Sequence, residues 1–65
     1  MIIKDFISGN PYGKEVVYRV YDAAADDIRI EGPTRLIINS NYGDKEIQDI
    51  WVTMIDGGII VTFSV

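Results

Sequence analysis

Carboxylate side chains gather in two stretches of this 65-residue chain, where they are candidates for holding a metal ion or docking a basic partner. The first group is Asp22, Asp26, Asp27 and Glu31, and the second is Asp44, Glu46 and Asp49. A calcium loop needs oxygen ligands at short, regular spacing around a sharp glycine turn. The stretch DAAADDIRIEG lacks that spacing, so we expect no metal and no cofactor. The remaining interpretations are an anionic docking face or a solvated face that keeps the chain in solution.

Aromatic side chains form the second set of candidate contact residues. Tyr12 and Tyr42 stand beside turn glycines, so we expect both to project from loop tips. Trp51 is either covered by another layer, a short helix or the N-terminal strand, or offered to a partner as an anchor. Of the two, we expect Trp51 to be covered. The candidate partner-binding residues are therefore Trp51, Tyr12, Tyr42, Asp22, Asp26, Asp27, Glu31 and Asp49.

Catalytic side chains are scarce. The chain has no histidine and no cysteine, which removes the commonest general base, the thiolate nucleophile and the usual zinc ligands. Lys4, Lys14 and Lys45 each adjoin a carboxylate, which keeps an amine protonated. The stretch GNPYGK is not followed by a helical pattern and does not match a phosphate-binding loop. The sequence therefore predicts a protein without enzymatic activity.

Turn residues recur at roughly the 8–12-residue spacing of an all-β domain. We predict one domain over residues 1–65, all-β or β-rich α+β, with a small antiparallel sheet of five or six strands as a meander or barrel. One short helical turn near residues 22–27, with Asp22 as its N-cap, is an optional addition. The predicted strands are 2–8, 14–22, 28–31, 34–39, 46–55 and 58–65.

The clearest single element is a hairpin that turns at Asp56-Gly57. One face then pairs Met54 with Ile59, Val52 with Val61 and Ile50 with Phe63, and we predict these six residues as core. The other face pairs Thr53 with Ile60, Trp51 with Thr62 and Asp49 with Ser64. The last nine residues, GGIIVTFSV, carry no charge and would aggregate as an exposed edge. We therefore expect a central strand in a monomer, or a homodimer through this C-terminal strand.

Two stretches resemble each other, SGNPYGKE at residues 8–15 and NSNYGDKE at residues 39–46. Their flanking residues do not match, so shared turn chemistry explains the likeness better than a repeated unit. We predict two hairpin turns. If both lie at one end of the sheet, Tyr12 and Tyr42 form part of a contact surface.

Ten acidic and six basic residues give a net charge of −4, which argues against non-specific binding to nucleic acid. The start MII is broken by Lys4-Asp5, and no apolar run approaches the ~20 residues of a membrane span. We expect a complete cytoplasmic protein without a leader.

The function we predict is a small acidic protein-binding module. A chain of this size and charge resembles phage-type antagonists of host defence, which suggests an inhibitor that occludes a basic, nucleic-acid-binding surface of its partner. One alternative is a small β-barrel that binds single-stranded nucleic acid, with Lys4, Arg19, Arg29 and Arg35 in a basic groove. Another is a structural, self-assembling domain.

Overall fold

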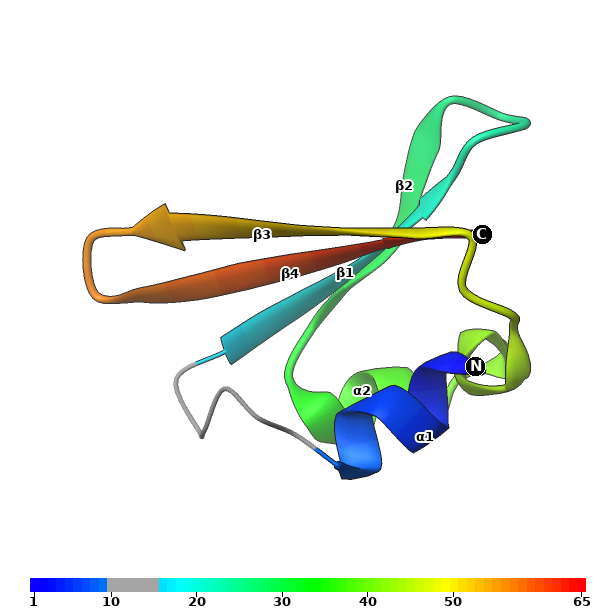
Figure 1. Ribbon diagram of the computed structural model, residues 1–65, viewed down its shortest axis with the longest axis horizontal. Helices are drawn as coiled ribbons and strands as arrows, with labels where there is room; N and C mark the ends of the chain where they lie inside the picture. The colour runs from blue at the N-terminus through cyan, green and yellow to red at the C-terminus, as the bar shows by residue number, and fades with distance from the viewer. Residues whose placement is uncertain (10–15) are drawn as a thin grey trace.

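The computed structural model describes residues 1–9 and 16–65 (Figure 1). In chain order its elements are α1 (Ile3–Ser8), β1 (Val16–Asp22), β2 (Asp27–Gly32), α2 (Thr34–Ile38), the 3-10 helix η1 (Asn41–Asp44), β3 (Asp49–Ile55) and β4 (Gly58–Ser64). The strands described form one sheet in the order β2-β1-β4-β3. The protein is therefore a small β-rich α+β domain. A sheet of five or six strands, and a closed barrel, were wrong predictions.

The sheet is mixed and open. β1 pairs with β4 in parallel, whereas the β1–β2 and β3–β4 pairs are antiparallel. The predicted meander was wrong. The chain leaves β2, passes through α2 and η1, and enters the sheet again at its far edge as β3. That connection is long enough to cross the sheet, so the final strand returns between β1 and β3.

Two predicted strands are helices. In the predicted strand 2–8, Ile3–Ser8 form α1, which buries Ile3 and Ile7 on one side, one helical turn apart. In the predicted strand 34–39, Thr34–Ile38 form α2, which follows Pro33 and buries Ile37. Proline is tolerated at a helix start because its missing N–H would have no partner there. In short runs such as these, a few isoleucines fit a strand and a helix equally well.

The turn after β1 is not helical. The Asp22 carboxylate accepts hydrogen bonds from the backbone N–H of Ala24 at 3.0 Å and of Ala25 at 3.3 Å, as a helix cap would. The chain nevertheless reverses at once into β2, with Asp26 at a positive φ of 52°. Aspartate tolerates this left-handed conformation better than most residues. The optional helical turn at 22–27, with Asp22 as its N-cap, was therefore wrong, and the Asp22 carboxylate instead accepts these hydrogen bonds within a strand-to-strand turn.

The C-terminal hairpin agrees with the sequence pair by pair. Every predicted partner from Asp49 with Ser64 to Met54 with Ile59 is found in the β3–β4 register. β4 has β1 on one side and β3 on the other, so the expectation of a central strand is confirmed. The homodimer through this strand stays a prediction, and any backbone pairing between copies would have to use β2 or β3.

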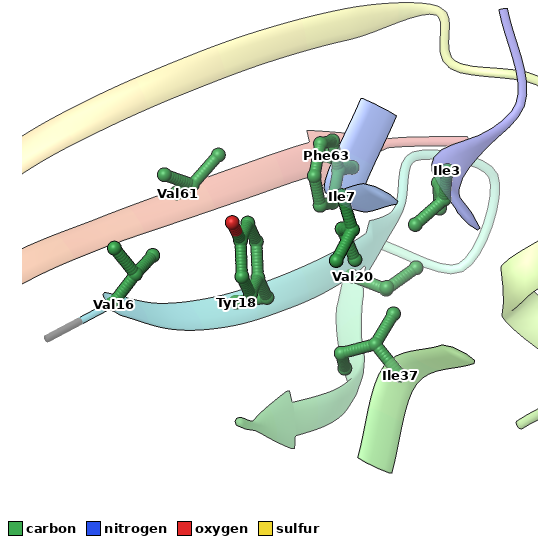
Figure 2. Packing of buried hydrophobic residues seen from close by; sticks show 8 residues of the cluster. All are labelled: Ile3, Ile7, Val16, Tyr18, Val20, Ile37, Val61 and Phe63. Atoms are coloured by element: carbon green, nitrogen blue, oxygen red, sulfur yellow. The ribbon is translucent and has the colours of Figure 1, made fainter. Parts of the chain in front are cut away.

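The core lies between the helices and one face of the sheet (Figure 2). Tyr18 stacks on Phe63 with ring centroids 5.6 Å apart, and Phe6 meets Phe63 edge-on at 5.4 Å. The fully buried side chains of the described residues are Ile3, Ile7, Tyr18, Val20, Ile37, Val61 and Phe63.

The predicted set of core residues extended too far along the β3–β4 hairpin. Val61 and Phe63 are buried, and Ile50 and Ile59 are partly buried against the cluster. Val52 and Met54 are exposed, Met54 by 73%. The hairpin of β3 and β4 extends past the helices, which cover only its other end (Figure 1).

The segment around NSNYGDKE is not a hairpin turn. It begins at Asn39, directly after α2, and contains the helix η1, where the Ser40 hydroxyl accepts a hydrogen bond from the backbone N–H of Tyr42 at 3.2 Å. The other Tyr-Gly segment, with Tyr12, lies outside the described residues. In residues 1–9 and 16–65, neither α-helix has the length and apolar character needed to cross a bilayer.

Candidate functional site

One face of the sheet carries the helices, and the described helices leave the opposite face uncovered (Figure 1). We call this uncovered side the open face. From the strand registers, its side chains are Val17, Arg19 and Tyr21 of β1, Ile60 and Thr62 of β4, and Trp51 and Thr53 of β3. Trp51 remains 46% exposed there, so the expectation that another layer covers it was wrong.

Trp51 is held by a specific neighbour. The rings of Tyr21 and Trp51 meet edge to face, with centroids 6.1 Å apart and an interplanar angle of 73°. Such aromatic pairs contribute about 0.5–1.5 kcal/mol beyond the area they bury. The register explains the contact, because Tyr21 stands beside Ser64 and Ser64 stands beside Asp49, two residues before Trp51. Ser64, the neighbour of Tyr21 in β4, is buried. On its other side, Tyr21 donates a hydrogen bond from its hydroxyl to the Asp26 carboxylate.

Four of the predicted carboxylates reach the same end of the sheet. Asp22, Asp26 and Asp27 lie where β1 turns into β2, and the cross-strand register places Asp49 at this end as well. We call Asp22, Asp26, Asp27 and Asp49 the acidic end. Arg29 is its counter-charge, with Nε 3.5 Å from Asp22 Oδ2 and Nη1 3.7 Å from Asp27 Oδ2. The acidic end lies beside the Trp51–Tyr21 pair, so anionic and aromatic groups share one surface.

The other predicted residues lie elsewhere. Glu31 Oε1 is 3.1 Å from Arg19 Nη2 across the β1–β2 pair. Asp44 is 2.7 Å from the Lys4 amine, and Glu46 pairs with the N-terminal amine. The second carboxylate group of the sequence is therefore divided, with only Asp49 at the acidic end.

Tyr42 does not project from a loop tip. It is half-buried in η1 and packs against the hydrophobic core. Together with Asp22, Ala24, Asn41, Lys45 and Val65 it lines a shallow depression. A joint contact surface of Tyr42 and Tyr12 is untested, because Tyr12 lies outside the described residues.

Sequence reasoning missed Tyr21 as a site residue. Its ring contacts Trp51 across the sheet, and its hydroxyl contacts Asp26 across the turn. The signal available was a tyrosine one position before the turn residues DAAADD. The contact with Trp51 depends on the parallel β1–β4 pair, which the sequence did not predict.

The Tyr21–Asp26 hydrogen bond changes the acidity of the phenol. It is the largest cause that raises the pKa of Tyr21 above its ordinary value, followed by partial desolvation and by the charges of Asp26 and Asp22. The Lys4 amine shows the same kind of effect, because its hydrogen bond to Asp44 raises the pKa of Lys4.

We predict that Asp26→Gly lowers the pKa of Tyr21, since glycine keeps the positive φ but removes the acceptor. Because the folded-state pKa of Tyr21 is raised, this stabilisation is complete below about pH 10 and is lost as the pH rises through the raised pKa. As the pH rises into the alkaline range, the free energy of unfolding should therefore fall less for Asp26→Gly than for the parent. Ultraviolet titration of phenolate, with Tyr21→Phe to assign the signal, measures the change. An unaltered titration of Tyr21 in Asp26→Gly would contradict the assigned cause.

Within residues 1–9 and 16–65, no three carboxylates come together in an arrangement that could hold a metal ion. Comparison of the chain with protein-family models, with curated proteins and with solved structures finds no match.

Proposed function

We propose that the protein is a non-catalytic protein-binding module that uses its open face. The observation that carries this proposal is Trp51, which is 46% exposed on an uncovered sheet face. Its orientation is fixed by the edge-to-face contact with Tyr21. Tryptophan and tyrosine are enriched among residues that dominate binding energy, and a ring already held in place loses little entropy on binding.

The charge beside this aromatic pair favours a basic partner. The acidic end has four carboxylates, and Arg29 is within ion-pair distance of two of them, Asp22 and Asp27. The whole chain carries a net charge of −4. Complementary charge speeds encounter and selects partners. Binding here would cover a basic surface of the partner, and the mechanism we propose is inhibition by occlusion of a nucleic-acid-binding surface, as in phage-type antagonists of host defence.

The nucleic-acid alternative has less support from the described contacts. Lys4, Arg19 and Arg29 are each within ion-pair distance of a carboxylate. A groove for single strands needs cations that are available to phosphates. Retention of the protein on single-stranded DNA or RNA at low salt would reverse this preference.

The proposal is tested by replacing Trp51 with serine. Leu36→Ser is the matched control, because Leu36 is also 46% exposed but belongs to α2, on the other side of the sheet. A partner is first captured on the immobilised parent from nuclease-treated lysate and purified. We then expect Trp51→Ser to weaken its binding by about 30-fold, equal to the ~2 kcal/mol of an anchor residue. Leu36→Ser should bind as the parent does.

Two results would refute the proposal. Equal affinity of Trp51→Ser and the parent would remove the open face as the contact surface. Affinity that does not fall as salt is added would remove the electrostatic role of the acidic end, because exposed charges are screened within about 10 Å at 0.1 M salt.

A further inference from the structure

The two edges of the sheet are built differently. Edge strand β2 carries Asp27, Arg29 and Glu31, ends at Gly32-Pro33, and has an irregularity in its pairing where Arg29 is skipped. Charges, a bulge and a nearby proline are the devices that natural sheets use to prevent edge-to-edge pairing. Edge strand β3 has an unbroken register with β4, and its residues 50–55 are uncharged and contain no proline. One edge is thus protected, and the other is open to a further strand.

The exposed apolar residues of β3 are arranged symmetrically. Trp51, Val52, Met54 and Ile55 are between 43% and 73% exposed. They are the two residues before Thr53 and the two residues after it. In a two-fold contact residue i meets residue j and j meets i, so the contact surface must complement itself. A strand whose apolar residues are symmetric about one position meets this condition in antiparallel pairing.

We propose that the protein forms a two-fold dimer in which β3 pairs antiparallel with β3 of the partner subunit, centred on Thr53. Trp51 then opposes Ile55 of the partner subunit, and Val52 opposes Met54 of the partner subunit. Thr53 opposes its own copy, and threonine pairs are favourable across antiparallel strands. Asp49 falls opposite Gly57 of the partner subunit, so carboxylates do not face each other directly.

A second copy fits this edge better than an unrelated strand does. Only the Thr53-centred register sets all four exposed apolar side chains against one another; centring on Val52 would set Trp51 against threonine and Asp49 against Ile55 of the partner subunit. The assembly also stops at two copies, because the joined sheet ends on both sides at the protected strand β2. This dimer replaces pairing through β4, whose two sides are occupied by β1 and β3. It does not rest on the proposed protein-binding function.

The test uses paired charge variants at Thr53. Thr53→Lys and Thr53→Glu each place like charges directly opposite in the dimer, and each should weaken self-association by about tenfold. Mixing the two variants should restore association, because lysine then faces glutamate. Sedimentation equilibrium across a concentration series measures the parent, each variant and the mixture, and circular dichroism confirms that every variant is folded. Ile28→Lys and Ile28→Glu, at an exposed apolar residue of β2, are the controls and should associate as the parent does.

A cysteine variant provides an independent readout. The chain has no cysteine, so Thr53→Cys introduces a single thiol. Directly opposed Cβ atoms in an antiparallel pair lie about 4.5–5.5 Å apart, close enough for a disulfide after a small adjustment. Mild oxidation should link Thr53→Cys into dimers and leave Ile28→Cys mostly monomeric. A parent that stays monomeric at high concentration, a mixture that does not recover, or equal effects at Ile28 would each overturn the proposal.

Discussion

Replacing Phe63 with alanine is expected to leave little folded protein. Phe63 is fully buried in central strand β4, stacked on Tyr18 and contacted edge-on by Phe6 of α1 (Figure 2). Removal of a buried phenylalanine costs about 3–5 kcal/mol, and a domain of this length has about that much stability in total. Loss of the ring also removes the contact that Phe63 of the sheet makes with Phe6 of α1. Thermal and urea unfolding followed by circular dichroism measure the change.

The control for this experiment is Met54→Ala. Met54 is apolar and lies in the neighbouring strand on the same sheet face, but it is 73% exposed. At a protein concentration low enough to keep the chain monomeric, its replacement should change the free energy of unfolding by less than about 0.5 kcal/mol. A Phe63→Ala protein that unfolds cooperatively near the parent's midpoint would show that the aromatic cluster does not hold the layers together.

The second large effect is expected for proline at Thr62. Thr62 lies between Arg19 of β1 and Trp51 of β3, and its side chain is on the open face, so replacement creates no core cavity. Because β4 has a partner on each side, proline removes a ladder hydrogen bond whichever way the backbone N–H points. The unpaired carbonyl alone costs about 1–3 kcal/mol, and the ring adds steric conflict. We expect the variant to be unfolded or close to it at room temperature.

Thr62→Val is the matched control, since valine keeps the branched side chain and the backbone donor. It should remain as stable as the parent within about 0.5 kcal/mol. If Thr62→Pro folded with normal stability, β4 would not be a central strand. Hydrogen exchange of the parent gives a second check, because amides of a doubly paired strand are among the last to exchange.

The sequence predicted the described strands well but mistook the two α-helices for strands. Asp56-Gly57 is a strong turn signal, and the alternation on both sides of it determines the register of β3 and β4. No such signal exists in residues 2–8 or 34–39, where isoleucines are compatible with either helix or strand. Their helical state depends on packing against the sheet. Ile3, Ile7 and Ile37 make this packing as members of the core. Tertiary packing therefore determined what local pattern left ambiguous.

The same dependence on tertiary packing limited how much of the candidate site could be predicted from the sequence. Asp22, Asp26 and Asp27 are close in sequence, so their grouping at one turn was predictable. The approach of Asp49 and Trp51 to Tyr21 was not, because it requires β1 and β4 to be neighbours. The exposure of Trp51 likewise depends on which face the helices cover. A sequence pattern assigns Trp51 to a face but does not tell which face is covered.

The parallel pairing of β1 with β4 also has a consequence for the folding kinetics. The β3–β4 hairpin closes over a two-residue turn, and β1 and β2 are joined by a four-residue turn. The β1–β4 ladder joins segments separated by more than half of the chain, and both strands contribute residues to the core. Closing that long loop costs entropy before any contact repays it, and pairings of this kind slow folding. We therefore expect the two local hairpins to form quickly and the β1–β4 pairing to be the slow step of folding.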